Sequence, residues 1–288
     1  MITGTTQLLG VIGHPIAHSL SPVMHNAAIA ELGVDFVYLP LPIAPENLGD
    51  AIKGFEAINL RGFNVTIPHK QAIMPLLDEI SPVAQEIGAV NTVCRTQQGW
   101  YGTNTDAAGF LAPLLQLPAQ NWQQTTVIIL GNGGAARAVV AGCAQLGCGS
   151  IQVVGRNLEK LQQFHASWQN SPAAKVLSVH SWEKLPVLLP NAVLVVNTTP
   201  IGMHPHEQQS PLNTADLTQI ATGTVAYDLI YTPRPTLFLQ QMQTQGAHII
   251  DGLEMLVQQG AAALQLWLQQ SVPVDVMRQS LLHYLSQR

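Results

Sequence analysis

Two short polar segments in the first half of the chain carry side chains suited to proton transfer. Residues 64–70 (NVTIPHK) end at Lys70, and residues 104–106 (NTD) end at Asp106. A lysine oriented by a carboxylate can act as a general acid in one reaction direction and as a general base in the other. Taken alone, Lys70 is more simply explained as a solvated surface lysine. The two segments together favour a catalytic pair of Lys70 and Asp106.

Further hydroxyl and amide side chains lie in polar segments next to apolar stretches. Residues 18–22 (HSLSP) contain Ser19 and Ser21, and residues 88–92 (GAVNT) contain Asn91. Such groups suit a polyhydroxylated ligand, because ligands of open α/β sheets gather at the carboxyl ends of the strands. Each also has a structural explanation, since a serine can cap a helix and an asparagine can close a turn.

A glycine-rich turn, residues 131–134 (GNGG), follows the apolar run 126–130 (TVIIL) and precedes a stretch rich in alanine and valine. Glycines at this position let backbone N–H groups approach a pyrophosphate at a helix N-terminus. The segment departs from the G-x-G-x-x-G pattern, because Ala136 stands where the third glycine would be. A simple strand-to-helix turn is the alternative. The flanking strand and helix favour a dinucleotide site.

Two cations follow the next apolar strand, Arg156 directly after Gly155 and Lys160 one helical turn further on. In NAD sites this strand end normally carries an acidic residue that binds the ribose 2′-hydroxyl. Either cation alone is explained as a solvated charge at the start of a helix. Together, and beside a glycine turn, they suit a 2′-phosphate. We therefore expect NADP as the cofactor.

Turn residues divide the chain into alternating strands and helices that would position these groups. We expect helices over residues 45–56 and 70–79, and another that begins with Ser21 as N-cap and Pro22 at the first helical position. We expect strands at residues 8–12, 36–41, 62–67, 90–95, 126–130, 151–154, 192–197, 224–228 and 248–250. Such alternation predicts mostly parallel sheets covered by helices on both faces.

An apolar stripe from Leu253 to Leu268 predicts an amphipathic helix near the end of the chain. We expect it to return to the first domain, because the nucleotide-binding part already has its helices. The sequence therefore predicts an α/β protein of two domains. The first is an open α/β substrate domain, residues 1–105, with residues 252–288 packed on it. The second is a Rossmann-type NADP-binding domain, residues 106–251.

The composition favours a protein that binds small molecules. Of 288 residues, 47% are hydrophobic and 10% are charged, and the formal net charge is -5. A negative protein lacks the basic excess of a nucleic-acid-binding surface, and no apolar run reaches the roughly 18 residues of a membrane span. We expect no metal site, because the histidines are scattered and Cys94, Cys143 and Cys148 lack metal-ligand spacing. Free, mostly buried thiols fit the cytoplasm. The sequence leaves a homodimer open.

Eight segments, in order along the chain, resemble the motifs of the shikimate dehydrogenase family. The polar segments match S-x-S-P, N-V-T-x-P-x-K, A-V-N-T and N-T-D, and the glycine turn and the basic segment match the cofactor motifs. Residues 197–203 match N-x-T-x-x-G-M, and residues 251–259 match D-G-L-x-M-L-V-x-Q. The resemblance implies an NADP-dependent oxidoreductase that reduces 3-dehydroshikimate to shikimate in chorismate and aromatic amino acid biosynthesis.

The resemblance also implies a role for each matching residue. It implies that Lys70 and Asp106 are catalytic. It implies that the hydroxyls and the carboxylate of the substrate are held by Ser19, Ser21, Thr66, Asn91, Asp106, Tyr231 and Gln259. It implies that NADP is held by Gly131, Gly133, Gly134, Ala135, Arg156, Lys160, Asn197, Thr198 and Gly252. Substrate on one domain and cofactor on the other would require the cleft to close.

Three positions depart from the family pattern, and two other functions stay open. Asn132 replaces the commoner alanine, Gly155 replaces an asparagine and so loses a side-chain contact with the cofactor, and Glu254 replaces a small residue. A quinate/shikimate dehydrogenase would accept quinate and would often prefer NAD, which Arg156 weighs against. A catalytically silent NADP-binding regulator would need neither Lys70 nor Asp106.

Overall fold

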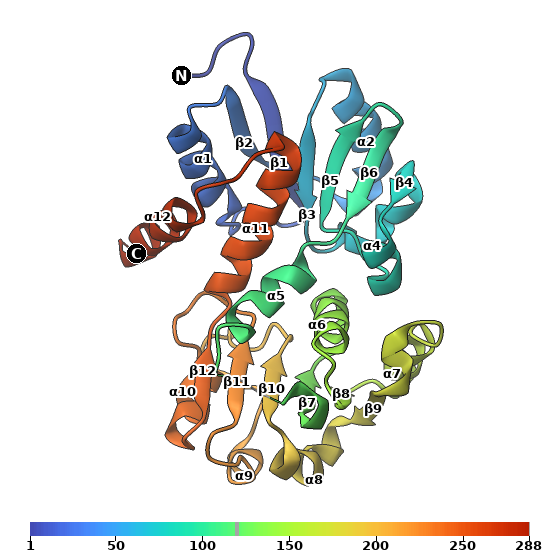
Figure 1. Cartoon of the computed structure of the whole chain (residues 1–288), viewed down its shortest axis with the longest axis vertical. Coiled ribbons are helices and arrows are strands. Elements are labelled where there is room, and N and C mark those ends of the chain that lie inside the picture. Colours follow the sequence, from blue (N-terminus) through green and yellow to red (C-terminus); the bar gives the residue numbers. More distant parts are fainter. Residues whose placement is uncertain (119–120, 288) are drawn as a thin grey trace. The chain divides into compact units, whose positions relative to one another are not determined.

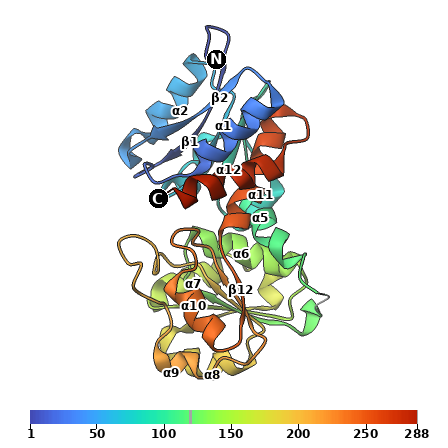
Figure 2. The same cartoon turned by 90° about the vertical axis from the view of Figure 1, so that its left-hand side faces the viewer.

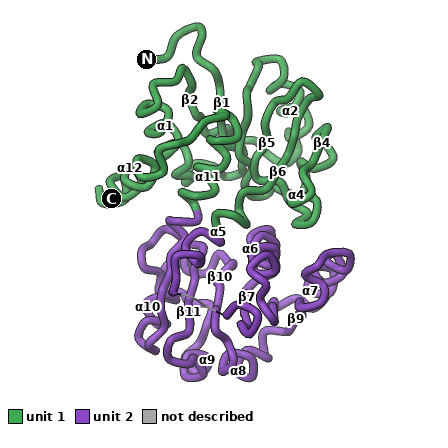
Figure 3. Tube along the Cα trace, viewed as in Figure 1, with its two compact units in different colours: residues 1–109, 256–288 green, residues 110–255 purple. Residues whose placement is uncertain are grey.

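The computed structural model describes residues 1–118 and 121–287. It divides into two compact units, unit 1 (residues 1–109 and 256–288) and unit 2 (residues 110–255), each built on one six-stranded sheet (Figures 1 and 3). The fold class is the mixed α/β one that the alternation predicts. No helix among the described residues is long and apolar enough to cross a lipid bilayer.

The sheet of unit 1 has the order β2-β1-β3-β5-β6-β4 and is mixed. Strand β1 pairs in parallel with β2 and β3, whereas β5 is antiparallel to both β3 and β6. The strands are β1 (Gln7–Gly13), β2 (Phe36–Pro42), β3 (Gly62–Val65), β4 (Glu79–Ile80), β5 (Thr92–Thr96) and β6 (Gly99–Thr103). The helices and 3-10 turns are α1 (Ser21–Leu32), η1 (Pro45–Asn47), α2 (Leu48–Ala57), α3 (His69–Ala72), η2 (Met74–Leu76), α4 (Pro82–Ile87) and α12 (Val274–Ser286). Two further helices are divided between the units: residues 110–114 of α5 (Asp106–Leu114) and residues 253–255 of α11 (Leu253–Leu268) belong to unit 2.

Helices cover both faces of this sheet. On one face, Ile52 and Phe55 of α2 pack with Phe63 and Val93 of the central strands. On the other face α11 lies directly on the sheet, because the Trp267 indole N–H donates to the Val93 carbonyl at 2.9 Å. Gly62 makes this possible, since a β-carbon there would collide with the Trp267 ring. Helix α12 packs on α1 (Figure 2). The C-terminal helix thus belongs to the first sheet, as predicted.

The sheet of unit 2 is entirely parallel, in the order β12-β11-β10-β7-β8-β9. This order is that of the doubly wound dinucleotide-binding fold, whose topological switch point falls between β7 and β10. The strands are β7 (Thr126–Leu130), β8 (Ser150–Gly155), β9 (Leu177–Ser181), β10 (Leu194–Asn197), β11 (Val225–Asp228) and β12 (His248–Ile250). The helices and 3-10 turns are η3 (Trp122–Gln124), α6 (Gly134–Gln145), α7 (Leu158–Ala166), η4 (Pro172–Lys175), η5 (Trp182–Lys184), α8 (Leu185–Leu188), η6 (Leu189–Asn191), α9 (Thr214–Leu217) and α10 (Leu237–Thr244).

Alternate residues of each central strand of unit 2 face different helices. Val127 and Ile129 pack against α5, α6 and α7, whereas Ile128 and Leu130 pack against α8, α9 and α10. A strand buried on both faces reads as a continuous apolar run, which is why TVIIL shows no polar alternation. Both faces of the parallel sheet therefore carry a hydrophobic core.

The structure corrects some expectations about local structure and adds elements that were not predicted. The helix expected over residues 70–79 is only α3, followed by the turn η2 and the short strand β4. Strands β6 and β9 and helix α12 were not predicted. The antiparallel pairing of β5 with β3 and with β6 was not predicted either, although most strand pairs are parallel, as the alternation indicated. Ser21 is the first residue of α1 and not its N-cap, since Leu20 occupies that position and offers no capping side chain.

Candidate active site

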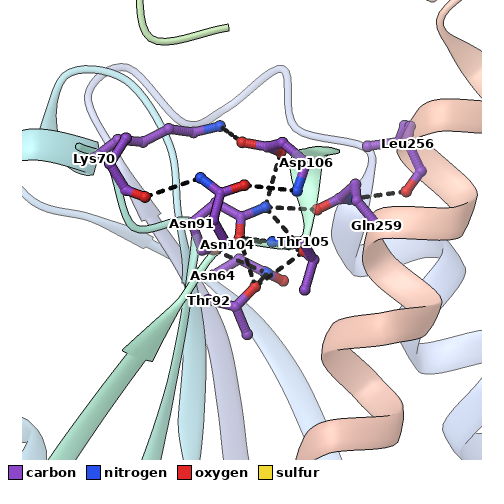
Figure 4. Close-up of polar contacts among 10 residues, drawn as sticks. Asn64, Lys70, Asn91, Thr92, Asn104, Thr105, Asp106, Leu256 and Gln259 are labelled. Atoms are coloured by element: carbon purple, nitrogen blue, oxygen red, sulfur yellow. Dashed lines mark hydrogen bonds and ion pairs between the residues drawn. The ribbon is translucent and has the colours of Figure 1, made fainter. Parts of the chain in front are cut away.

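An ion pair between Lys70 and Asp106 lies at the carboxyl end of the central strands of unit 1. The Lys70 Nζ atom donates to Asp106 Oδ2 at 2.5 Å, and the two side chains are 20% and 9% exposed (Figure 4). Lys70 lies in α3, which the chain enters from β3 through a turn closed by the His69 N–H and the Thr66 carbonyl at 2.9 Å. Asp106 is the first residue of α5.

The side chain of Asn91 fixes the other oxygen of the Asp106 carboxylate. Asn91 Nδ2 donates to Asp106 Oδ1 at 2.8 Å, and Asn91 Oδ1 accepts from the Thr105 N–H at 2.8 Å. Asn91 is buried, with 2% of its surface exposed. A buried amide must satisfy its donors and acceptors within the protein, so its orientation is set. The carboxylate is therefore held at both oxygens before any ligand binds.

Helix α11 brings Gln259 from the end of the chain to the same cluster. Asn91 Nδ2 lies 3.4 Å from Gln259 Oε1, and Gln259 Nε2 donates to the Leu256 carbonyl at 2.8 Å (Figure 4). Four of the residues singled out from sequence, Lys70, Asn91, Asp106 and Gln259, thus lie in one hydrogen-bonded group. We define them as the polar cluster.

A second set of side chains, on β2, β3 and β5, supports the polar cluster through hydrogen bonds. Asn64 Nδ2 donates to the Asn91 carbonyl and to Thr92 Oγ1, both at 3.1 Å, while the Tyr38 hydroxyl donates to Asn64 Oδ1 at 2.7 Å. Burial raises the pKa of Tyr38 well above its ordinary value, so the phenol stays a neutral donor. Tyr38 stacks on His25, with ring centroids 4.1 Å apart, and burial lowers the pKa of His25 to about 4.

Sequence reasoning missed Tyr38, because nothing local marks it. The sequence shows only that Tyr38 lies in an expected strand, and the apolar pattern of that strand does not mark it as different from its neighbours. The one available signal is general: a buried phenol requires a hydrogen-bond partner. Asn64 stands at the start of the segment that ends at Lys70, where it reads as one polar residue among several. Its role becomes clear only when β3 and β5 pair and bring it against Asn91.

The hydroxyl residues Ser19, Ser21 and Thr66 also lie in unit 1. Ser19 Oγ accepts from the Ser21 N–H at 3.4 Å, and Ser21 is buried in the first turn of α1. Thr66 directly follows β3, and its N–H donates to the Ile12 carbonyl at 2.9 Å. Tyr231 lies in unit 2, on the segment after β11, where burial raises the pKa of its phenol.

The glycine turn of unit 2 fits an anionic ligand. Gly131 adopts a φ of +103° and lies against the segment after β10, since a β-carbon there would be 2.8 Å from Thr198 Oγ1. Gly133 and Gly134 face open space, because a β-carbon on either would meet nothing within 4 Å. Helix α6 begins at Gly134. Its first N–H groups are therefore open to a phosphate that approaches over the glycines.

Two exposed cations follow β8 in the same unit. Arg156 and Lys160 are both exposed, and within residues 1–118 and 121–287 neither side chain makes a hydrogen bond or an ion pair with the protein. Arg137, at the end of the glycine motif, behaves differently. Its guanidinium lies over the Phe164 ring at 5.2 Å and donates to Ser167 Oγ at 2.8 Å. Arg156 and Lys160 are thus open to a ligand, whereas Arg137 braces α6 against α7.

Asn197 is a positioning group rather than an open contact. Its Nδ2 donates to the Ile201 carbonyl at 3.1 Å and to Asp228 Oδ1 at 3.0 Å, while its Oδ1 accepts from the Thr199 N–H at 3.0 Å. The hydroxyl of Thr198 donates to the Leu130 carbonyl at 2.7 Å. Both residues therefore shape the turn that lies against Gly131.

Gly252 has a packing reason to be glycine. Its N–H donates to the Ile230 carbonyl at 3.1 Å, and a β-carbon would collide with the backbone of Leu229. Ala135 continues the first turn of α6 after the open glycines.

Comparison with known proteins gives consistent matches over the chain. Residues 11–93 match the family described as the shikimate dehydrogenase substrate binding domain, and residues 252–282 match the shikimate 5'-dehydrogenase C-terminal domain. A shikimate dehydrogenase (NADP(+)) from Nostoc sp. is 65% identical over 286 residues, which cover 99% of each chain.

Two solved structures agree with the fold over nearly the whole length. A crystal structure of a shikimate dehydrogenase in complex with NADP+ is 35% identical, with a TM-score of 0.89 and coverage of 99% of this chain and 97% of the other. A shikimate 5-dehydrogenase from Listeria monocytogenes, in complex with shikimate and NAD, is 34% identical with a TM-score of 0.88 and coverage of 97% and 98%.

Proposed function

The chain belongs to the shikimate dehydrogenase family, and we propose that it catalyses the reversible, NADPH-dependent reduction of 3-dehydroshikimate to shikimate. It is an NADP-dependent oxidoreductase with a place in chorismate and aromatic amino acid biosynthesis. The observation that carries the assignment of the reacting groups is the ion pair of Lys70 and Asp106, held in place by Asn91.

Lys70 supplies and removes the proton in this proposal. NADPH, when bound, supplies the hydride to the carbonyl carbon. The Lys70 ammonium donates a proton to the carbonyl oxygen during reduction, and the amine takes it back from the hydroxyl during oxidation. Asp106 orients Lys70 through Oδ2 and keeps free lone pairs on both oxygens for a substrate hydroxyl, since an ionised carboxylate offers about four acceptor sites. Lys70 and Asp106 therefore act together in the proton transfer.

The remaining polar groups of unit 1 would hold the substrate. Ser19, Ser21 and Thr66 offer hydroxyls from the segments after β1 and β3, and Asn91 and Gln259 offer amides from the polar cluster. Together they suit a ring that carries several hydroxyls and a carboxylate. Tyr231 would add a phenol from unit 2.

The cofactor would bind at the carboxyl edge of the sheet of unit 2. Gly131, Gly133, Gly134 and Ala135 would receive the pyrophosphate at the start of α6, and Arg156 and Lys160 would bind the 2′-phosphate. Thr198 and Gly252 would border the nucleotide, while Asn197 shapes the turn next to it. What supports this assignment is the open space over Gly133 and Gly134 and the exposure of Arg156 and Lys160, neither of which has a side-chain partner among the described residues.

The domain division and the setting of the enzyme complete the proposal. Residues 1–105 with 252–288 would form the substrate-binding domain, and residues 106–251 the NADP-binding domain. Cys94, Cys143 and Cys148 are free thiols, which is consistent with a cytoplasmic enzyme. A homodimer would show as twice the chain mass of 31.0 kDa in sedimentation velocity.

Oxidation of shikimate and of quinate, each with NADP+ and with NAD+, tests the function in four assays of the purified protein. We expect the highest kcat/KM for shikimate with NADP+. Preference for NAD+ with turnover of quinate would instead identify a quinate/shikimate dehydrogenase. Binding of NADP+ without turnover in any of the four assays would identify a silent regulator.

Asp106→Asn tests whether the carboxylate acts in both binding and catalysis. The substitution keeps the shape but removes the charge that orients Lys70, so we expect kcat to fall and the shikimate KM to rise together. An unchanged kcat with a raised KM would make Asp106 a binding group only. Pre-steady-state hydride transfer, followed at the NADPH absorbance, separates this chemical step from product release.

A further inference from the structure

The amide of Asn132 lies directly over Gly155 in unit 2. An ideal β-carbon on Gly155 would lie 3.3 Å from Asn132 Oδ1 and 3.1 Å from Leu161 Cδ2. The space beside Gly155 is therefore narrow, and a side chain there would require Leu161 and Asn132 to shift by a few tenths of an ångström. The glycine at the end of β8 and the asparagine in the glycine turn therefore form a matched pair.

The backbone holds this pair together. The Gly131 N–H donates to the Val154 carbonyl at 2.8 Å, which joins the residue before Asn132 to the residue before Gly155. Asn132 is half-buried, and no hydrogen bond of its side chain to the rest of the described chain is present. A polar amide without a hydrogen-bond partner among the described residues thus lies next to the residue that precedes Arg156.

We propose that Asn132 is a cofactor-specificity residue whose side-chain amide binds the phosphate on the adenosine ribose of NADP(H), beside Arg156. The inference rests on the proposed role of Arg156 and deepens it. The Asn132 Nδ2–H group donates to a phosphate oxygen, and its Oδ1 lies beside the position that a Gly155 β-carbon would take. Asn132 thus supplies, from the glycine turn, a polar group that the end of β8 does not carry.

Replacing Asn132 by aspartate separates recognition from packing. The side chain keeps its size, but a carboxylate has no donor and repels a phosphate. Isothermal titration should show the ratio of the NADP+ Kd to the NAD+ Kd raised by about tenfold or more, which corresponds to the loss of one hydrogen bond to a charged partner. Asn132→Ala should raise the NADP+ Kd by a smaller factor. Asn191→Asp adds the same charge at the amino end of β10 and serves as the control.

A double substitution tests the matched pair itself. Gly155→Ala places a methyl group against both Asn132 and Leu161, so it should raise the NADP+ Kd of the parent protein. In an Asn132→Ala background only the Leu161 contact remains, and the same change should cost a smaller factor. Equal factors in the two backgrounds would overturn the pairing. Thermal unfolding of each variant without cofactor checks that the fold is retained.

Arg156→Ala in the same titrations separates this inference from the proposal beneath it. An unchanged ratio of NAD+ to NADP+ Kd in Arg156→Ala would overturn the phosphate site and, with it, the role of Asn132. A changed ratio in Arg156→Ala, with an unchanged ratio in Asn132→Asp, would overturn the role of Asn132 alone. Changed ratios in both variants, with none in Asn191→Asp, would support the inference.

Discussion

The charged side chains of the polar cluster of unit 1 are paired with each other, whereas those of Arg156 and Lys160, at the edge of unit 2 where we propose that NADP binds, are not. In the cluster, Lys70 and Asp106 neutralise each other at 2.5 Å and are mostly buried. At the edge, Arg156 and Lys160 are exposed and have no protein partner among the described residues. The polar cluster is therefore assembled within the protein, whereas Arg156 and Lys160 would receive their counter-charge from the cofactor in the function proposed above.

The difference follows from what each site would do. A group that transfers a proton must be held in a productive geometry beforehand, because reorganisation at the moment of reaction raises the barrier. A cation that binds a phosphate needs only to be available, and an exposed ion contact is screened by salt. Substitutions in the cluster should therefore disturb several neighbours together, whereas substitutions at the edge should act locally and depend on ionic strength.

Lys70→Ala should have the largest effect. Loss of general acid–base assistance typically lowers kcat by about 10² to 10⁴, while the other substrate contacts remain. Turnover should therefore collapse with little change in the shikimate Kd, measured by titration calorimetry. Lys53→Ala, which removes an exposed lysine of α2, is the matched control. A variant that kept more than about a tenth of the turnover would show that Lys70 is not the acid.

Asp228 shows that unit 2 also contains a buried ionisable group. Its carboxylate is fully buried and accepts from Asn197 Nδ2, the Ile230 N–H and Thr236 Oγ1. Burial raises the pKa of Asp228 from 3.8 to about 6, with a smaller contribution from Asp251. The folded protein then holds the proton more tightly than the unfolded chain does. This group favours folding below pH of about 4, and its contribution is lost as the pH rises through about 6.

Asp228→Asn should remove this pH dependence. A shift of about two pKa units corresponds to a contribution on the order of 3 kcal/mol. Relative to the variant, the wild type should lose free energy of unfolding as the pH rises from about 4 to 7, and then level off. Urea unfolding at several pH values measures the difference, in which the other carboxylates cancel. A difference independent of pH would mean that Asp228 is ionised throughout this range.

Arg156 is the simplest test of the edge. A hydrogen bond to a charged partner contributes about 1.5 to 3 kcal/mol, so Arg156→Ala should lower kcat/KM for NADPH by roughly tenfold to a hundredfold. Activity with NADH should barely change. Arg156→Asp should go further, since a carboxylate repels the phosphate and accepts from a bare 2′-hydroxyl. Lys160→Ala should cost less, because a lysine lacks the planar fork of arginine.

The same Arg156 variants test whether the effect of this side chain is local and depends on ionic strength. Their effect on NADPH should shrink as ionic strength rises, because the lost contact is between exposed charges. Equal losses with NADPH and NADH would show that Arg156 supports the fold instead of binding the phosphate. A wild type that preferred NADH would move the assignment to a quinate/shikimate dehydrogenase.

The sequence predicted best where a pattern is local. The apolar run 126–130 and the glycines after it are found as β7 and the start of α6, because a buried strand and a tight turn each leave a composition signal. The contact of Lys70 with Asp106 followed from two motifs. The hydrogen bonds that support this pair could not be predicted, because Asn64, Thr92 and Tyr38 meet only through strand pairing. Long-range pairing leaves no local pattern.

Short elements were the other source of error. The stretch 70–79 has a helical pattern of apolar residues, but Pro75 restricts the backbone, and the last residue of the stretch already belongs to strand β4. Ser21 precedes a proline, which favours a helix start, yet the helix begins one residue earlier than the capping rule places it. Capping depends on backbone geometry that the residue types alone do not set.

The smallest expected effect on substrate binding is that of Ser21→Ala, and its prediction depends on the finding that Ser21 is not the N-cap of α1. If Ser19 and Ser21 bind the substrate as proposed, each of Ser19→Ala and Ser21→Ala would remove one neutral hydrogen bond, worth about 0.5 to 1.5 kcal/mol, and each should raise the shikimate KM by roughly twofold to tenfold. Loss of a true N-cap would also cost about 1 kcal/mol of stability. Because the Ser21 side chain does not cap α1, its variant should melt close to the wild type and still show the raised KM. A lowered Tm with an unchanged KM would make Ser21 structural. Substrate binding at the start of α1 would then depend on Ser19 alone, and the Ser21 hydroxyl would be one of the buried groups of unit 1 that support the site.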